Sequence, residues 1–342
     1  MKPSRTRYNG LDALKLICSF LVIVIHLAIP STYYYYLRGM ARIAVPVFFL
    51  ITGYFYVNTS RKKRKQQIIR ILKLLIISLT AYLLLGALHI YIFGGIFSNL
   101  SSYLSSFFSP SSIFKLLVFN QSHESAVHLW YLSALLYVLI VYYLAYPLPK
   151  KYVFIRKNKY LILTLFTIVL LLINLSIGEF SPFIFGKKIT TIAYSRNFLF
   201  TGLPYFSLGI LLHSPFIKSL LNQIKPSVAL AVTIFVLIFY LAELRFIDRP
   251  LDNYFSTAIL SLSGFVFFAK LKINDTNPIA ICGRKYSLGI YITHPVVQCL
   301  DELGVFNGSV MMHLRTHHRL RPYSGNSNML LQSKINVQKA LT

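Results

Sequence analysis

Residues 71–93 read ILKLLIISLTAYLLLGALHIYIF, an apolar run in which Lys73 is the one charged side chain. A helix needs about 20 residues to cross the hydrocarbon core of a bilayer, which is about 30 Å thick. Every backbone N–H and C=O group in lipid must find its partner within the protein, and a helix supplies those partners within one segment. The stretch therefore predicts a membrane-spanning helix.

Runs of this kind recur along the whole chain. Of its 342 residues, 56% are hydrophobic and 13% are charged, against about 25% charged in soluble domains. The sequence shows none of the alternating segments of about 10 residues that mark a transmembrane barrel. We therefore expect an all-α, polytopic transmembrane helical bundle of about nine spans: 11–30, 42–58, 71–93, 128–148, 160–177, 198–213, 226–243, 253–269 and 286–303.

The basic residues divide unequally between alternate loops. With the N-terminus on the cytoplasmic side, the inner segments hold 22 of the 35 Lys and Arg residues, the outer segments 8 and the C-terminal tail 5. Basic residues favour cytoplasmic loops. We expect a multi-pass protein of the cell membrane with a cytoplasmic N-terminus, and the composition is compatible with a bacterial inner or plasma membrane.

Several other classes of protein are disfavoured. The net charge of +26 is explained by loop asymmetry in a membrane protein, so we expect no nucleic-acid partner. Cys18, Cys282 and Cys299 are widely spaced in or beside apolar runs, which indicates neither a disulfide framework nor a metal site. The group His123, Glu124 and His128 is better explained as a solvated loop than as a metal cluster. No P-loop, Gly-x-Ser-x-Gly or His-Glu-x-x-His motif occurs.

The first span carries a polar stripe. At 100° per residue, Asp12, Lys15, Ser19 and His26 fall within a sector of roughly 60°. Ionisable groups inside a span are costly and usually face the bundle interior. Asp12 and Lys15 also suit a structural i,i+3 ion pair. His26 could act as a base near neutral pH, although a lone histidine is more often a packing residue.

The second span begins with Arg42 and contains Pro46, which should kink the helix. A short outer connection would bring Arg42 to the level of His26. A permanently charged guanidinium beside a base suits an oxyanion or an acidic group, although Arg at a helix end also serves as an interfacial anchor. His128, Trp130 and Tyr131 open the fourth span, where an aromatic belt explains Trp130 and Tyr131 equally well.

Taken together, these segments resemble the acyltransferase-3 family of integral membrane acyltransferases. The resemblance covers about residues 7–298, and the lineage looks closest to the branch that includes the membrane domain of vancomycin-resistance serine racemases. The matching features are Asp12, Lys15 and His26; Arg42-x-x-x-Pro46-x-Phe48-Phe49 with Thr52-Gly53-Tyr54; His128-Leu-Trp130-Tyr131-Leu; and Gly283-Arg-Lys-Tyr286-Ser287-Leu-Gly289-Ile-Tyr291-Ile-Thr-His294-Pro295.

The resemblance implies transfer of an acyl group, usually acetyl, from cytoplasmic acyl-CoA to a hydroxyl or amine of an envelope carbohydrate or similar acceptor. Acyl-CoA would be a co-substrate, and no bound cofactor is expected. His26 and Arg42 match the family's histidine and arginine and are the expected catalytic residues. His26 would deprotonate the acceptor or take the acyl group briefly, and Arg42 would stabilise developing charge. The expected donor-binding or substrate-binding residues are Asp12, Lys15, Ser19, His128 and Trp130.

Two further segments carry expectations. The Ser-rich loop 94–127 is too long for a plain connector, which favours a lid or substrate-facing role, with a flexible surface loop about equally acceptable. We divide the chain into a transmembrane domain, 1–303, and a polar basic tail, 304–342. The family pattern has ten spans and the last has no counterpart here, so the tail could be aberrant or native.

Two alternatives to the enzyme remain open. A small-molecule carrier or flippase would be expected to show repeat symmetry and helices broken near mid-membrane, and the sequence shows no convincing repeat. The other alternative is an inactive product of a truncated gene, which the unusual tail suggests.

Overall fold

The computed structural model describes residues 8–26, 33–93, 99–189, 192–247 and 251–302. In these ranges the chain is helical, with no strand. The elements are α1 Asn9–His26, α2 Tyr33–Ala41, α3 Ala44–Tyr56, α4 Arg61–Phe93, α5 Leu100–Phe107, α6 Pro110–Phe119, the 3-10 helix η1 Glu124–Leu129, α7 Trp130–Ala145, α8 Leu148–Lys151, α9 Val153–Ile177, α10 Ser181–Phe185, α11 Ile192–Ser195, the π-helix η2 Phe198–Gly202, α12 Leu203–Leu211, α13 Pro215–Gln223, α14 Pro226–Ile247, α15 Phe255–Lys270 and α16 Pro278–Glu302.

The described residues confirm the expected helical bundle, while the number of spans differs from the prediction. Six helical segments of the described residues, two of which join a pair of the elements above, are long and apolar enough to cross a membrane. A seventh crossing results if η2–α12 and α13, which meet at a bend of 71°, count as one span. The two remaining predicted spans are α15, which has 16 residues, and α16, which has 25 and carries Arg284 and Lys285. The described parts of all nine predicted segments are thus mainly helical, but α15 and α16 are not among the helices long and apolar enough to cross a membrane.

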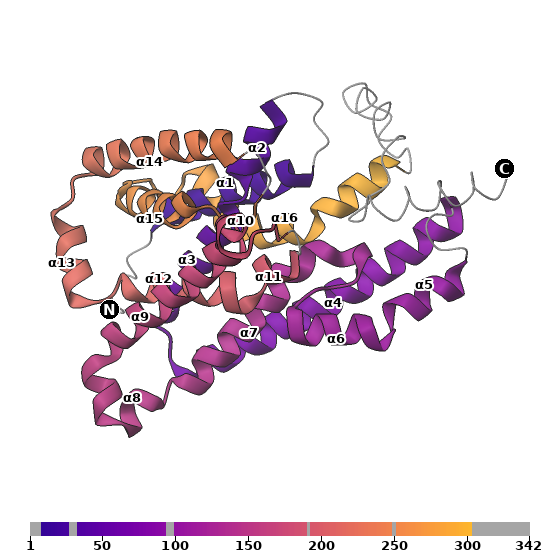
Figure 1. The fold of residues 1–342 in the computed structure, drawn as a ribbon, viewed down its shortest axis with the longest axis horizontal. Coiled ribbons are helices and arrows are strands. Elements are labelled where there is room, and N and C mark those ends of the chain that lie inside the picture. Colours follow the sequence, from indigo (N-terminus) through magenta and orange to yellow (C-terminus); the bar gives the residue numbers. More distant parts are fainter. Residues whose placement is uncertain (1–7, 27–32, 94–98, 190–191, 248–250, 303–342) are drawn as a thin grey trace.

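The centre of the bundle is built from α1, α3, α7, α12 and α16 (Figure 1). Helix α1 packs on α16, α3 and α15, while α3 packs on α12. The span from Tyr35 to Tyr56 buries 61% of its apolar window, whereas α9 buries 17%. Lipid is as apolar as leucine, so outer helices such as α9 can leave their apolar side chains exposed to it.

Glycines allow the central helices to approach closely. A Cβ added at Gly53 of α3 would lie 2.0 Å from the carbonyl oxygen of Phe206, and one at Gly209 of α12 would lie 2.1 Å from that of Leu50. Close backbone contact through small residues is a main source of helix association in membranes. These two glycines therefore fix the α3–α12 pair.

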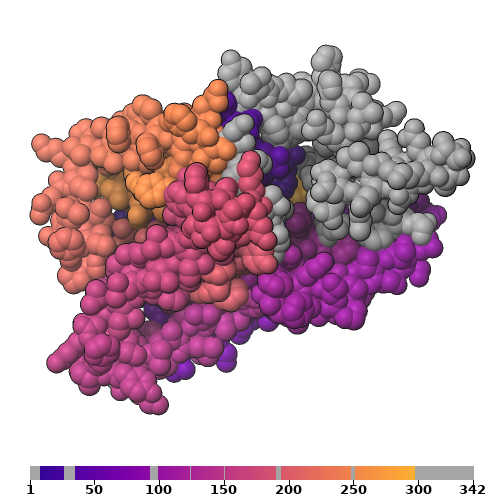
Figure 2. Space-filling view, in the orientation of Figure 1, coloured from indigo at the N-terminus to yellow at the C-terminus, as the bar shows by residue number. Residues whose placement is uncertain are grey.

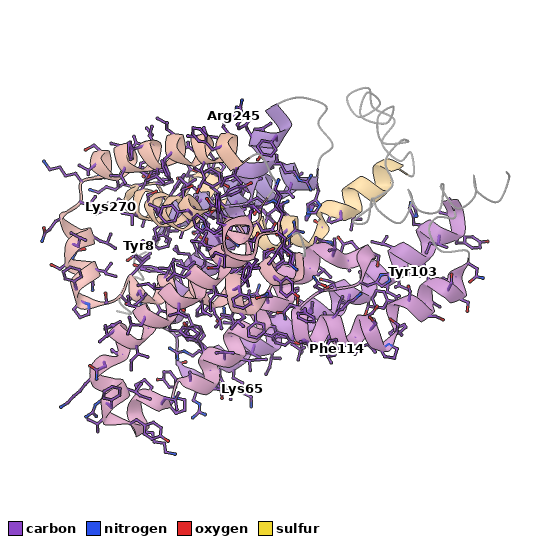
Figure 3. The ribbon with its side chains drawn as sticks, viewed as in Figure 1. Tyr8, Lys65, Tyr103, Phe114, Arg245 and Lys270 are labelled. Atoms are coloured by element: carbon purple, nitrogen blue, oxygen red, sulfur yellow. The ribbon has the colours of Figure 1, made fainter. Side chains whose placement is uncertain are left out.

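The two ends of the bundle carry the residues that the charge bias assigns to opposite sides of the membrane. In Figure 3, Tyr8 and Lys270 lie at the left of the molecule and Lys65 near its bottom, while Arg245 lies at the top and Tyr103 at the right. The space-filling view shows α13 and α14 along one side of the molecule and α4 to α7 along the opposite side (Figure 2). We refer to the two ends as the predicted cytoplasmic end and the predicted outer end.

The long loop after α4 folds into two helices that return along the bundle (Figure 1). Asn99 and Ser109 cap α5 and α6 through their side chains. The hydroxyl of Tyr103, a buried residue, contacts the carbonyl oxygens of Tyr82 and Leu83 on α4 at 3.5 and 3.4 Å. Helix α5 thus packs on α4, and α6 on α5, whereas residues 94–98 and the predicted tail 304–342 lie outside the described residues.

The helix break that Pro46 causes lies one turn before Pro46 itself. Helix α2 ends at Ala41 and α3 begins at Ala44, so Arg42 and Ile43 form a turn between them. A proline ring clashes with the carbonyl of the residue four positions before it, here Arg42. The expected kink therefore lies at Arg42 itself and frees its side chain from the regular helix surface.

Candidate active site

The polar stripe of α1 faces α16, as its position within one sector predicts. The Asp12 carboxylate lies 3.7 Å from the Arg284 guanidinium, and the His26 ring centroid lies 4.8 Å from that of His294. Between these contacts, the Ser19 hydroxyl donates to the carbonyl oxygens of Lys15 and Ser287, at 2.8 and 3.1 Å. The Ser19 hydroxyl thus ties α1 to α16, while the two ends of the stripe reach two separate cavities.

Four of the predicted site residues line one cavity of about 50 Å³ toward the predicted outer end. His26 comes from the end of α1, Arg42 from the turn before α3, His128 from η1 and Trp130 from the start of α7. We call this space the histidine cavity. Its size is enough for a few water molecules or a small reacting group. Residues from two distant stretches of the sequence, 26–42 and 128–130, therefore line one space.

An ion cluster that the sequence analysis missed completes the histidine cavity. Asp252 accepts from Arg42 at 2.6 Å, from Arg196 at 3.0 Å and from the Ser195 hydroxyl at 2.7 Å. The side chains of Arg42, Arg196 and Asp252 are 9%, 17% and 16% exposed. Two guanidinium groups share one carboxylate, so the cluster carries one excess positive charge.

The pKa of Asp252 reflects the balance of these neighbours. Burial alone would raise the pKa of this carboxyl, but Arg196 and Arg42 hold it well below its usual range, with help from the Ser195 hydroxyl. Asp252 is therefore ionised at neutral pH and positions both arginines. Asp252 follows α14 by five residues, and no local pattern in the sequence pairs it with Arg42.

Three histidine rings pack together here: His26 and His128 line the cavity, and His294 lies against both of them. The His294 ring centroid lies 4.8 Å from that of His26 and 5.4 Å from that of His128. The His128 ring also packs edge-on against Tyr82 at 4.4 Å. In the sequence, His294 appears only as part of the last segment that resembles the family. In the folded protein its ring packs against His26 and His128, which line the cavity.

Lys15 lines a second cavity of about 250 Å³, nearer the predicted cytoplasmic end. Gln67, Arg70 and Arg284 also line it, so we call it the basic cavity. Tyr291 lines both the basic cavity and the histidine cavity. The Tyr291 hydroxyl donates to the carbonyl oxygen of His128, which fixes this aromatic ring between the two spaces.

The Asp12 carboxylate lies beside the basic cavity, where it contacts two cationic side chains. Its carboxylate accepts from Lys15 at 2.8 Å and lies near Arg284. Asp12 and Arg284 also line a wider cavity of about 1020 Å³ that includes Lys218 and Lys270. The predicted Asp12–Lys15 ion pair is thus present, and it borders the spaces that open toward the predicted cytoplasmic end.

Within the described ranges, no group of three or more His, Cys, Asp or Glu side chains is arranged to hold a metal ion. His123, from the loop considered for such a cluster, instead bonds to Ser106 and Ser125 at 3.0 and 3.1 Å. Arg5 and Arg7 of the basic N-terminal segment lie outside the described residues.

Comparison with known proteins adds one finding. A family model described as an acyltransferase domain matches residues 8–309. No curated protein and no solved structure matches this chain. The matched segment includes every residue of the histidine cavity and of the basic cavity.

Proposed function

The chain belongs to the acyltransferase-3 family, and from this premise we propose that it transfers an acyl group, acetyl in the first instance, from acyl-CoA to an envelope carbohydrate or a similar acceptor. The acceptor group would be a hydroxyl or an amine. The observation that carries this proposal is the convergence of His26, Arg42 and His128 on one cavity. A potential base and a permanent cation that border the same small space are the two groups that acyl transfer needs.

The reaction follows from these two groups. A ring nitrogen of His26 takes the proton from the acceptor O–H or N–H as the oxygen or nitrogen attacks the thioester carbonyl carbon. The carbonyl oxygen becomes an oxyanion, which the N–H groups of Arg42 stabilise. When the intermediate collapses, the carbon–sulfur bond breaks, and the CoA sulfur leaves and receives the proton held by His26. Asp252 positions Arg42 through their bond of 2.6 Å.

The basic cavity supports a donor site on the predicted cytoplasmic side. Lys15, Arg70 and Arg284 supply three cations to one space, and cations of this kind bind phosphates well. Tyr291 borders both this cavity and the histidine cavity. The proposal therefore places the CoA phosphates in the basic cavity and directs the acyl thioester past Tyr291 toward His26.

Trp130 and His128 support an acceptor site on the other side of His26. Both line the histidine cavity at the predicted outer end. His128 lies just before α7, and Trp130 is the first residue of α7. An indole offers an apolar face with a polar N–H, which suits contact with a sugar ring. In this proposal the donor and the acceptor approach His26 from opposite ends of the bundle.

Acetyl transfer from labelled acetyl-CoA tests the proposal. Membranes that contain the parent protein, His26→Ala or Arg42→Ala at matched abundance are compared with empty membranes for label in an envelope fraction. We expect His26→Ala to lower the rate about 10²- to 10⁴-fold and Arg42→Ala about 10²-fold or more. His213→Ala is the matched control, because His213 lies by Tyr54, away from the histidine cavity.

The outcome separates the enzyme from its alternatives. Label in the parent that disappears with His26→Ala supports an acyltransferase that works through this residue. Equal label in the parent and empty membranes would contradict the proposal and leave the carrier or the inactive chain. Uptake of a labelled amino acid into cells that express the parent would then favour the carrier, and its absence would favour the inactive chain.

A further inference from the structure

Two ring nitrogens beside His26 are buried without a hydrogen-bond partner. They are Nε2 of His128 and Nε2 of His294. The two residues are 6% and 5% exposed, and their ring centroids lie 5.4 Å apart. A buried polar atom without a partner is destabilising, and native proteins keep few of them. Because the two rings contact each other and His128 lines the histidine cavity, these two atoms point to a ligand that supplies their partners.

The hydrogen bond of His294 defines what its free nitrogen offers. Nδ1 of His294 lies 2.8 Å from the carbonyl oxygen of Tyr291, one turn earlier in α16. A carbonyl oxygen only accepts, so Nδ1 carries the proton. In a neutral imidazole the other nitrogen is then an acceptor with a lone pair. Nε2 of His294 therefore needs a donor such as O–H, and it lies on the ring edge away from its own backbone.

His128 is held just as firmly. Its ring packs edge-on against Tyr82 at 4.4 Å, and its carbonyl oxygen accepts from the Tyr291 hydroxyl. The same residue, Tyr291, thus anchors the backbone of His128 and the ring of His294. Because both imidazoles are preorganised by one neighbour, a ligand that bonds to them loses little free energy in ordering the site.

We propose that His128 and His294 form a hydroxyl-reading pair that selects acceptors with neighbouring hydroxyl groups. The inference rests on the proposed function and names the acceptor class for it. One hydroxyl reacts at His26, while an adjacent hydroxyl donates to Nε2 of His294 and bonds to Nε2 of His128. The His294 ring lies 4.8 Å from the His26 ring, so the two hydroxyl positions are neighbours. A compound with a single hydroxyl or an isolated amine leaves both nitrogens without partners.

Competition by sugars tests the pair without an identified natural acceptor. Methyl α-D-glucopyranoside and its monodeoxy analogues are added to membranes that transfer label from acetyl-CoA to the envelope fraction. In the parent, we expect the complete sugar to inhibit transfer. We expect at least one deoxy analogue to need about a tenfold higher concentration for the same inhibition, because it leaves a buried acceptor unpaired. The Michaelis constant for acetyl-CoA should not change.

The variants His294→Asn and His294→Gln separate the hydrogen bond made by Nδ1 of the ring from the one proposed for Nε2. The asparagine amide can still donate to the Tyr291 carbonyl as Nδ1 does, but it has no atom at the place of Nε2. In this variant the complete sugar and its deoxy analogue should inhibit equally weakly. The longer glutamine can place its amide oxygen near the position of Nε2, so part of the discrimination should return. His213→Asn, at the other end of the bundle, should discriminate as the parent does.

Two results would overturn the inference. The first is a parent that transfers label but is inhibited by none of these sugars. The second is a His294→Asn protein that still distinguishes the sugar from its deoxy analogue. A purely structural role would give this result, because it would weaken inhibition by both compounds by the same factor. If His294→Asn shows no transfer, the same comparison with His128→Asn and His294→Gln decides. A parent without any transfer would instead contradict the proposed function itself.

Discussion

At the scale of single residues, Asp252 governs the charge of the candidate site. Without it, Arg42 and Arg196 would be two neighbouring cations with side chains 9% and 17% exposed. Removal of one partner from a buried ion pair costs several kcal/mol, because the remaining charge stays out of water. Asp252 thus sets the orientation of Arg42 and leaves the cluster with one excess positive charge.

We therefore expect Asp252→Asn to lower the free energy of unfolding by about 3 kcal/mol at neutral pH. The pKa of Asp252 is lowered in the folded protein, so its contribution is present above the unfolded value of about 3.9. The contribution falls away as the pH drops below that value. The measurement is the thermal unfolding midpoint of the parent and the variant in detergent at pH 7 and at decreasing pH.

The matched control for this prediction is Asp275→Asn. Asp275 is an exposed carboxylate whose Oδ1 accepts from the Asn9 amide at 2.8 Å. An asparagine oxygen can keep that bond, so the substitution should shift the midpoint little at any pH. A difference between the parent and Asp252→Asn that stays constant or grows as the pH falls below about 4 would contradict the prediction.

At the scale of elements, the contact between α1 and α16 places the histidines. A Cβ at Gly283 would lie 1.8 Å from the carbonyl oxygen of Asp12 on α1. Real Cβ atoms do not approach so closely, so Gly283→Ala must push α16 away from α1. The Ser19–Ser287 bond and the His26–His294 contact lie along the same interface.

We expect Gly283→Ala to lower acetyl transfer about tenfold or more, because a displacement of about 1 Å at a reaction site costs on the order of 10²-fold in rate. The control is Gly289→Ala on the same helix, where an added Cβ meets no atom within 4 Å. That variant should keep near-parental activity at matched abundance. Equal activity of the two variants would show that the α1–α16 spacing does not set the rate.

At the scale of the whole molecule, the direction of the bundle decides which cavity meets which substrate. The basic cavity would meet cytoplasmic acyl-CoA only if the end that carries Lys62 is inside. The charge bias predicts this orientation, and Lys65 and Tyr103 lie well apart in Figure 3.

Cysteine labelling in intact cells checks this orientation. In a background with Cys18, Cys282 and Cys299 replaced, Lys188→Cys and Lys62→Cys each introduce a thiol at an exposed position. A membrane-impermeant maleimide should label the thiol at 188 in intact cells and the thiol at 62 only after permeabilisation. The reverse pattern would invert the molecule and place the basic cavity outside.

Local sequence by itself predicts most of the membrane-spanning helices and the polar stripe of α1, although α5 and α6 lie in the segment 94–127 that is expected to be a loop. These features depend on local hydropathy and on a periodicity of 3.6 residues, both of which any segment carries within itself. The same local information aligned Asp12, Lys15, Ser19 and His26, and the structure confirms that this stripe faces a neighbouring helix, α16. The family resemblance supplied His26 and Arg42 as candidates for catalysis.

Only the tertiary structure decided which distant residues share the site. Arg42 and Asp252 are 210 positions apart, and His294 reaches His26 through the packing of α16 on α1. In a bilayer the apolar surfaces of helices give little preference for one neighbour over another. Partners are therefore chosen by close contacts at small residues and by polar bonds between helices. Those choices involve the whole bundle, so no single stretch of the sequence could reveal Arg196, Asp252 or His294 as parts of one site.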